Sequence, residues 1–346
     1  MSNDSPGWFG NRIRKTEIDM RHADTKFLRA VAILLILNSH LDKFYPISAL
    51  ATGGSIGNSM FFFLSAYGLS LSQHARNQPF VAWWMNRLMR IFPALWLVLI
   101  LISLPLSMVQ NKLNGCSFET IVGYFFNPPY WFLQTLLVFY LLAFPLFNKT
   151  RQGMVPKIIF LLAIIYIGAY LTCIDLSQWS IEETPFDRIH YLMIFLFGIC
   201  IAGIQRLIVY TGFWDFVALS LCLLIIYGHK FLMSMGIWAE LQIVQHAAVY
   251  PMLIYLLKIS RSSFVVASLR HQGLSRVYSY LADNSLEIYM IHQSIRHPVL
   301  ELGMPFPVNL AVLLFLTFAM AALVHRLVVA VQNHFDGKRK TEASTA

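Results

Sequence analysis

The chain has 346 residues, of which 57% are hydrophobic and 12% are charged. Soluble domains contain about 45–50% apolar and about 25% charged residues, so this composition excludes an ordinary water-soluble protein. The formal net charge of +9 is compatible with nucleic-acid binding, but the basic residues are distributed as in a membrane protein. Nucleic acid is therefore not expected as a partner.

Ten apolar segments of about 20 residues follow one another along the chain, and a segment of that length crosses the hydrocarbon core as a helix. Because the bilayer offers no partners for bare backbone groups, these spans must be helices and not strands. The sequence therefore predicts an all-α fold, a polytopic transmembrane helical bundle. The predicted spans are 26–45, 55–73, 88–109, 130–147, 156–174, 189–208, 213–232, 241–258, 278–296 and 307–331.

The basic residues orient this bundle. With the N-terminus inside, all but five of the 26 Lys and Arg residues fall on the cytoplasmic side, as the positive-inside rule requires. The five exceptions are Lys43, Lys112, Arg188, Lys230 and Arg296. Both termini are thus predicted to be cytoplasmic, with a tail over 1–25, one membrane domain over 26–333 and a tail over 334–346. No cleavable signal peptide is expected before the first span.

Arg29 and His40 lie in the first predicted span, where ionisable groups are costly and indicate function by default. They are 11 positions apart, which at about 100° per residue places them on one helix face. Their axial separation of about 16 Å puts Arg29 near the cytoplasmic surface and His40 in the outer half of the bilayer. A neutral imidazole there can act as a general base. The alternative is that His40 caps the span and Arg29 is a topological anchor.

The second and third spans carry two further patterns. Ser65 and Gly68 interrupt an aromatic run, and small residues of this kind favour close helix packing over a chemical role for the Ser65 hydroxyl. Arg87 and Arg90 are three residues apart, so both guanidinium groups project from one helix face at the cytoplasmic boundary. Such a pair suits phosphate, although two arginines facing lipid headgroups would explain it equally well.

The ninth span places Glu287 in the middle of the membrane and His292 towards the outside, with Tyr289 between them. An uncompensated carboxylate in hydrocarbon is costly, so Glu287 is expected to pair, for instance with an arginine, or to be protonated. The four cysteines show no metal-site spacing. No metal is expected.

These patterns together resemble the acyltransferase-3 family of bacterial membrane acyltransferases, over nearly the whole chain. The Arg-x10-His signature is matched by RAVAILLILNSH, the aromatic motif by FFFLSAYG and the RxxR motif by NRLMRIFPALW. The WFL segment at Trp131–Leu133 agrees, as does a late Ser-x-x-x-Tyr-x-x-His pattern, here Ser285, Tyr289 and His292. Ala66 stands where Gly is usual in the family, and the extracytoplasmic SGNH-type domain that some members carry is not expected here.

The resemblance implies transfer of an acyl group, commonly acetyl from acetyl-CoA, to a hydroxyl of a surface polysaccharide or its lipid-linked precursor in the bacterial inner membrane. Arg87 and Arg90 would bind the phosphates of acyl-CoA, Arg29 would line the donor passage, and His40 would act as general base or, as a second choice, accept the acyl group itself. Acyl-CoA would be a co-substrate, with no permanently bound cofactor. The expected substrate cavity is lined by Ser65, Tyr67, Trp131, Glu287, Tyr289 and His292.

Two other functions remain open from the sequence. A transporter or flippase that moves a glycolipid or an acyl carrier would also place Arg, Glu and His inside the membrane. The RxxR pair separates this alternative from an acyltransferase, because a CoA site needs it and a proton pathway does not. A structural scaffold would leave Arg29 and His40 unexplained. The oligomeric state is not determined by the sequence.

Overall fold

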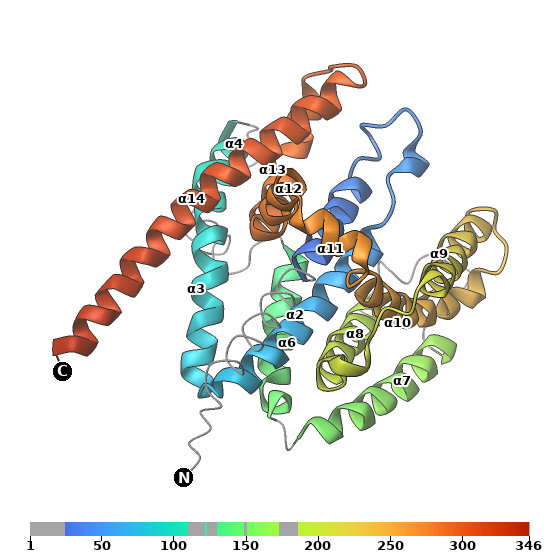
Figure 1. The fold of residues 1–346 in the computed structure, drawn as a ribbon. Coiled ribbons are helices and arrows are strands. Elements are labelled where there is room, and N and C mark those ends of the chain that lie inside the picture. Colours follow the sequence, from blue (N-terminus) through green and yellow to red (C-terminus); the bar gives the residue numbers. More distant parts are fainter. Residues whose placement is uncertain (1–24, 110–121, 123–129, 149–150, 173–185, 346) are drawn as a thin grey trace, which may run out of the picture. The chain divides into compact units, whose positions relative to one another are not determined.

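The computed structural model describes residues 25–109, 122, 130–148, 151–172 and 186–345, with side chains up to residue 334 (Figure 1). Within these residues the chain is helical and contains no strand. The predicted all-α fold is therefore confirmed. The chain divides into two compact units.

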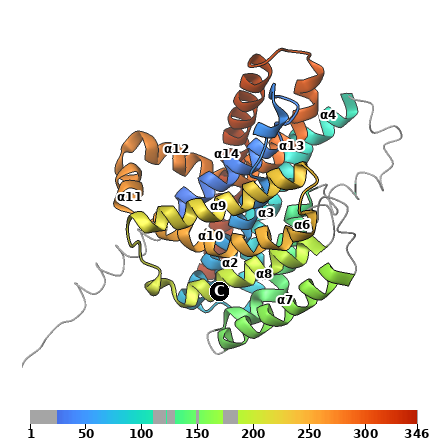
Figure 2. The ribbon, with the colours of Figure 1, turned by 90° about the vertical axis from the view of Figure 1, so that its right-hand side faces the viewer.

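The first unit comprises Met1–Ala32, Ser59–Leu71 and Lys149–Ala282. Helix α9 packs along α10, and α7 along α8, as both ribbon views show (Figures 1 and 2). The helices of this unit are α7 (Val155–Thr172), α8 (Phe186–Gly203), α9 (Phe213–Ser234), α10 (Gln242–Ile259), α11 (Ser263–Arg270) and α12 (Gln272–Asp283), with the short turns η4 (Gln152–Met154), η6 (Gln205–Leu207) and η7 (Ala239–Leu241). The middle of α2 (Gly54–Arg76) also belongs to it.

The second unit comprises Ile33–Asn58, Ser72–Asn148 and Asp283–Ala346. Its central helix, α13, packs against α14 and α3. The elements of this unit are η1 (Ser48–Leu50), α3 (Phe80–Val98), the π turn η2 (Leu99–Ser103), α4 (Leu104–Val109), α6 (Trp131–Ala143), η3 (Phe144–Phe147), α13 (Ser285–Glu301) and α14 (Val308–Thr345). A further helix covers residues 25–39, of which 33–39 fall in this unit.

Pro93 lies inside α3 and explains one contact between α3 and α14. A proline has no backbone N–H, so the carbonyl of the residue four positions earlier loses its helical partner. That carbonyl belongs to Met89, and it accepts a hydrogen bond from the side-chain amide of Gln332 in α14, at 3.0 Å. The Met89 carbonyl, which Pro93 leaves without a helical partner, thus forms a polar contact between the apolar helices α3 and α14.

Gly198 sets the packing of α8 against the middle of α2 in the first unit. A Cβ added at Gly198 would lie 2.4 Å from the backbone oxygen of Phe63 and 3.1 Å from the Cβ of Ala66. The methyl group of Ala66 is therefore accommodated by a glycine on the facing helix. Small residues permit this close approach of two membrane helices.

Five helices are long and apolar enough to cross a membrane, counted over the described residues, and a sixth is added if α10 and α11, bent by 57°, form one span. The five are Phe80–Val109, Gln152–Thr172, Phe186–Gly203, Phe213–Ser234 and Val308–His334. Each overlaps a predicted span, and a shorter apolar helix at Trp131–Phe147 overlaps another. The total of ten spans and the cytoplasmic position of the termini stay predictions.

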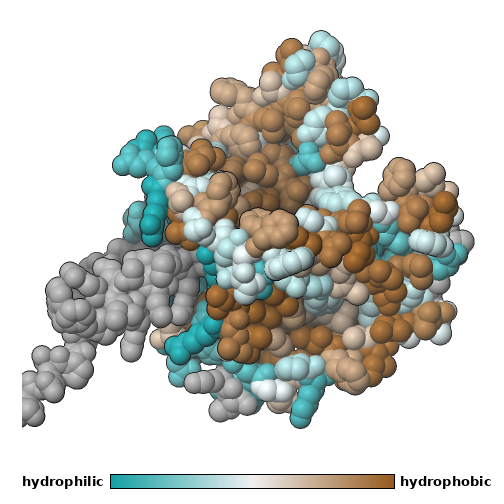
Figure 3. All heavy atoms as spheres, turned by 45° about the vertical axis from the view of Figure 1, so that its right-hand side comes forward, coloured by the Kyte–Doolittle hydropathy of each residue, from teal (hydrophilic) through white to brown (hydrophobic). Residues whose placement is uncertain are grey.

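The outer faces of these helices are apolar. On α7, Phe160 and Leu171 are each 69% exposed, and on α14 Phe315 is 71% exposed. Figure 3 shows apolar side chains over wide areas of the face that it displays. Because a soluble protein rarely exposes large contiguous apolar patches, these surfaces are suited to contact lipid.

Candidate functional site

His40 lies one residue beyond the end of the helix over 25–39. Its backbone N–H donates to the carbonyl of Leu37 at 3.1 Å, which tightens the last turn. Asn38 explains why the helix stops, because its side-chain amide donates to the carbonyls of Leu50 at 2.8 Å and Thr52 at 2.9 Å and holds the following loop against the helix end. The first span is predicted to reach residue 45, but the helix ends at residue 39. His40 therefore lies one residue past the helix whose face it was predicted to share with Arg29.

Two side chains of α13 contact the His40 ring. The amide nitrogen of Gln293 lies 2.9 Å from Nε2 of His40, and Nη1 of Arg296 lies 3.2 Å from Nδ1. All three side chains are partly exposed. Both ring nitrogens of His40 are thus engaged by groups that the sequence analysis did not single out for the site.

His292 lies one turn before Arg296 on α13, and its ring forms a pair with that of His40. The two ring centroids are 5.2 Å apart and the rings are tilted by 37°. His292 is 1% exposed, and its Nδ1 lies 2.9 Å from the carbonyl oxygen of Ile288. Its Nε2 is buried and has no hydrogen-bond partner among the residues that the structure describes. The structure therefore brings two of the predicted site residues into one centre, which we call the His40–His292 centre.

The chemistry of the neighbours decides where the ring hydrogens lie. An arginine side chain has donors only, so Nδ1 of His40 must accept from Arg296 and a neutral ring then carries its hydrogen on Nε2. The oxygen and nitrogen of the Gln293 side-chain amide are then exchanged in assignment. Its carbonyl oxygen accepts the hydrogen on Nε2 of His40. In His292 the Ile288 carbonyl can only accept, so Nδ1 donates and Nε2 keeps the bare lone pair.

Tyr289 and Glu287 lie on the same helix as His292. The Tyr289 ring is in contact with the rings of Tyr130, Phe132 and His292, at centroid distances of 6.0, 5.6 and 5.9 Å. Glu287 is 3% exposed and accepts a hydrogen bond of 2.9 Å from Nδ1 of His325 in α14. The expectation that Glu287 finds a partner is met, but the partner is a histidine and not the arginine given as an example.

Arg87 and Arg90 lie in α3, as the helical spacing predicts. The guanidinium carbon of Arg87 lies 5.9 Å from the centroid of the Trp83 ring, a cation–π contact. The Nε of Arg87 is buried without a hydrogen-bond partner in the part of the chain that the structure describes. Arg90 is exposed. A buried donor without an acceptor is costly, and an anionic ligand at Arg87 would remove that cost.

Arg29, Ser65 and Tyr67 belong to the first unit, whereas the His40–His292 centre belongs to the second. The Nε of Arg29 donates to the carbonyl of Thr25 at 3.3 Å, and Ser65 is half-buried. Tyr67 is 1% exposed and its hydroxyl donates to Gln205 at 3.2 Å. Each of these three residues thus has its own surroundings within the first unit. Trp131, 37% exposed, begins α6 in the second unit and contacts Phe132.

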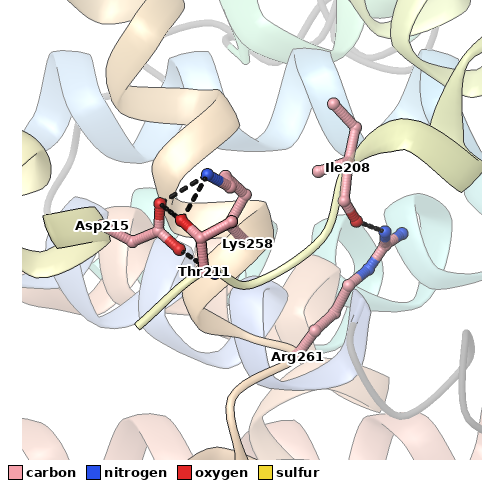
Figure 4. A network of polar contacts seen from close by, with 5 residues as sticks. All are labelled: Ile208, Thr211, Asp215, Lys258 and Arg261. Atoms are coloured by element: carbon pink, nitrogen blue, oxygen red, sulfur yellow. Dashed lines mark hydrogen bonds and ion pairs between the residues drawn. The ribbon is translucent and has the colours of Figure 1, made fainter. Parts of the chain in front are cut away.

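The basic residues near the end of α10 hold the connection between α8 and α9 (Figure 4). Lys258 donates to Asp215 at 2.5 Å, and Asp215 also accepts from the backbone N–H and hydroxyl of Thr211 at 2.6 and 2.9 Å. Arg261 donates to the carbonyl of Ile208 and, at 3.1 Å, to the hydroxyl of Tyr67. Tyr67, predicted as a cavity residue, is therefore part of this structural network.

Sequence reasoning missed Gln293 and Arg296, although both stand next to the Ser-x-x-x-Tyr-x-x-His pattern. Arg296 was counted only among the five basic residues on the outer side of the bundle. It also missed a polar cluster in which Ser294 of α13 lies 2.7 Å from the hydroxyl of Ser103 and 3.1 Å from that of Tyr130. Over the described residues, no three His, Cys, Asp or Glu side chains are grouped so that they could hold a metal ion.

Comparisons with known proteins place this arrangement in a family. The family model for acyltransferase family 3, described as an acyltransferase domain, matches residues 23–326, nearly the whole chain. A comparison with curated proteins gave no match, and neither did a comparison with solved structures. The match includes every residue of the predicted site, and the apolar helices agree with a multi-pass membrane protein. The chain therefore belongs to acyltransferase family 3, whose members are membrane acyltransferases.

Proposed function

We propose that the protein is an O-acyltransferase of the bacterial inner membrane that moves an acyl group, most simply acetyl, from cytoplasmic acyl-CoA to a hydroxyl of a cell-surface polysaccharide or its lipid-linked precursor. The observation that carries this proposal is the His40–His292 centre inside a chain of the acyltransferase-3 family. A hydroxyl group attacks a thioester readily only when a base takes its proton. Two imidazoles close together, one with a bare lone pair, supply such a base.

Arg87 and Arg90 support the assignment of an acyl-CoA donor. They lie three residues apart on α3. The buried Nε–H of Arg87 has no hydrogen-bond acceptor among the described residues. Phosphate groups satisfy guanidinium donors bidentately. The phosphates of CoA therefore bind at this pair in the proposed function, and Arg29 lines the passage by which the thioester enters.

Arg296 supports the transfer step itself. Attack on a thioester carbonyl places negative charge on its oxygen, and donors aimed at that oxygen are usually the largest contribution to catalysis. Arg296 lies against His40 and has no carboxylate partner at salt-bridge distance among the described residues. A cation that is not neutralised by an acidic side chain is available to a developing oxyanion.

The test is mass spectrometry of surface glycans from cells with and without the intact protein. We expect the glycan repeat to gain the mass of an acetyl group, or of another acyl group, only when the protein is present. The purified full-length protein in lipid nanodiscs should then release CoA from acetyl-CoA when that glycan is added. Unchanged glycan masses together with altered glycan export would instead support the transporter alternative.

A further inference from the structure

The His40–His292 centre contains two imidazole rings, but their nitrogen atoms are not equivalent. The lone pair of His40 is on Nδ1 and is occupied by the guanidinium of Arg296 at 3.2 Å. The lone pair of His292 is on Nε2, which is buried and free of hydrogen bonds within the described part of the chain. An imidazole whose lone pair already accepts from a cation is a poor proton acceptor, because protonation would break that hydrogen bond and bring two positive charges together.

We propose that His292, and not His40, is the general base that takes the proton from the acceptor hydroxyl. The guanidinium of Arg296, together with the Nε2–H of His40, which the Gln293 carbonyl oxygen and the oxyanion share, stabilises the negative charge on the thioester oxygen. This assignment rests on the proposed function. It reverses the role that the Arg-x10-His signature gives to His40, and it assigns roles to Arg296 and to Gln293, which orients the His40 ring from its Nε2 side.

The transfer step is balanced by these groups alone. The acceptor oxygen forms a bond to the thioester carbonyl carbon while its proton moves to Nε2 of His292. The carbon–sulfur bond then breaks, and the CoA thiolate that leaves takes the proton back from His292. The products are the ester and CoA thiol, and both imidazoles return to the neutral state.

The position of His292 suits a base that must be protected until the acceptor arrives. The Ile288 carbonyl accepts from Nδ1–H at 2.9 Å, which fixes the ring and stabilises the imidazolium that forms. The charged or titratable neighbours that act on His292 are His40 and Arg296, and on the same helix the Tyr289 ring touches it. His292 is 1% exposed and its ring lies against that of the partly exposed His40, so bulk water has little access to the lone pair. Exclusion of water limits hydrolysis of the thioester.

Two conservative variants of the full-length protein in nanodiscs separate the two histidines. In His292→Asn the side-chain amide stands where Nδ1–H was and still donates to Ile288, but the base is gone. In His40→Gln the amide N–H stands where Nε2–H was, so a donor to the oxyanion is kept. The assay measures acceptor-dependent release of CoA from acetyl-CoA with the glycan that gains mass in wild-type cells.

We expect His292→Asn to lose a factor of about 10² to 10⁴ in rate, the usual contribution of a general base, and His40→Gln to stay within about tenfold of the wild type because a donor remains. The assignment is overturned if His292→Asn stays within that tenfold range, or if His40→Gln is as inactive as a well-folded His292→Asn. An inactive wild type would remove the proposed function, and the assignment with it.

The pH profile of His40→Gln decides the matter where His292→Asn fails to fold, as judged by gel filtration. A general base is protonated in acid, so the rate falls as the pH is lowered. With His292 as the base, this fall persists in His40→Gln. Its disappearance in that variant would show that His40 was the titrating group and would overturn the proposal.

Discussion

Both units of the protein contain two histidines with their rings close together. In the first unit His190 and His246 stack at 4.3 Å, and the hydroxyl of Tyr166 lies 2.7 Å from Nδ1 of His246. In the second unit the ring centroids of His40 and His292 are 5.2 Å apart and the rings are tilted, and Arg296 contacts His40. The residue patterns in the sequence indicate a role for the second pair and none for the first.

A bare ring nitrogen does not distinguish these pairs, since Nδ1 of His190 is also buried without a partner among the described residues. The surroundings do. His190 is in ring contact with Tyr166, Tyr191 and Tyr250, and both histidines of the pair are buried. The second pair has the guanidinium of Arg296 beside it, and His40, Gln293 and Arg296 are all partly exposed. A histidine pair thus becomes a candidate for chemistry when charge stabilisation and access accompany it, and otherwise it fills a core.

Apart from His292→Asn, the largest expected effect is that of His40→Ala. This change removes a donor to the oxyanion and the ring nitrogen that accepts from Arg296. We expect acyl transfer to fall by a factor of about 10² to 10³, the effect of losing an oxyanion donor, while the protein still inserts into the membrane. Glycan mass spectrometry at equal expression measures it. Normal acylation in this variant would place the reacting centre elsewhere.

Arg296→Gln should have the next largest effect. It keeps a side-chain donor for Nδ1 of His40 but removes the positive charge near the thioester oxygen. We expect kcat to fall by about 10-fold to 100-fold with little change in KM for acyl-CoA, because the lost interaction strengthens only in the transition state. Arg296→Lys, which retains the charge, should be less affected. An unchanged kcat in Arg296→Gln would contradict the role in charge stabilisation.

Arg87→Ala should change donor binding and leave the chemical step intact. Loss of a charged hydrogen-bond donor to phosphate weakens binding by about 1.5–3 kcal/mol, so we expect KM for acetyl-CoA to rise by about tenfold or more with kcat preserved. Arg270, an exposed arginine on α11, provides the control. Equal KM values for Arg87→Ala and Arg270→Ala would show that Arg87 is only a topological anchor.

His190→Phe should have the smallest effect and tests the comparison from its other side. Phenylalanine keeps the aromatic contacts with Tyr166 and Tyr250 and removes a buried nitrogen that has no partner. We expect the rate of acyl transfer to remain unchanged and the thermal midpoint in detergent to stay the same or rise. A loss of transfer comparable to that of His292→Asn would mean that the first pair also takes part in the reaction.

The sequence by itself determined the fold class and the family. Apolar segments of membrane length require helices, because a bare backbone in hydrocarbon has no other way to satisfy its hydrogen bonds. The order of the motifs, from RAVAILLILNSH to the late Tyr289 and His292 pattern, was sufficient to indicate the acyltransferase-3 family. Local spacing also placed Arg87 and Arg90 on one helix, since residues three apart share a face.

Only the tertiary structure decided which helix faces meet. The partner of Glu287 is His325, 38 positions away, and the groups on His40 are Gln293 and Arg296, more than 250 positions away. Helical periodicity reveals which residues lie on one face but not which face of another helix packs against it, because apolar surfaces are interchangeable and only the specific polar contacts fix the arrangement. The end of the first helix was equally hidden, since Asn38 stops it through bonds to a loop that folds back.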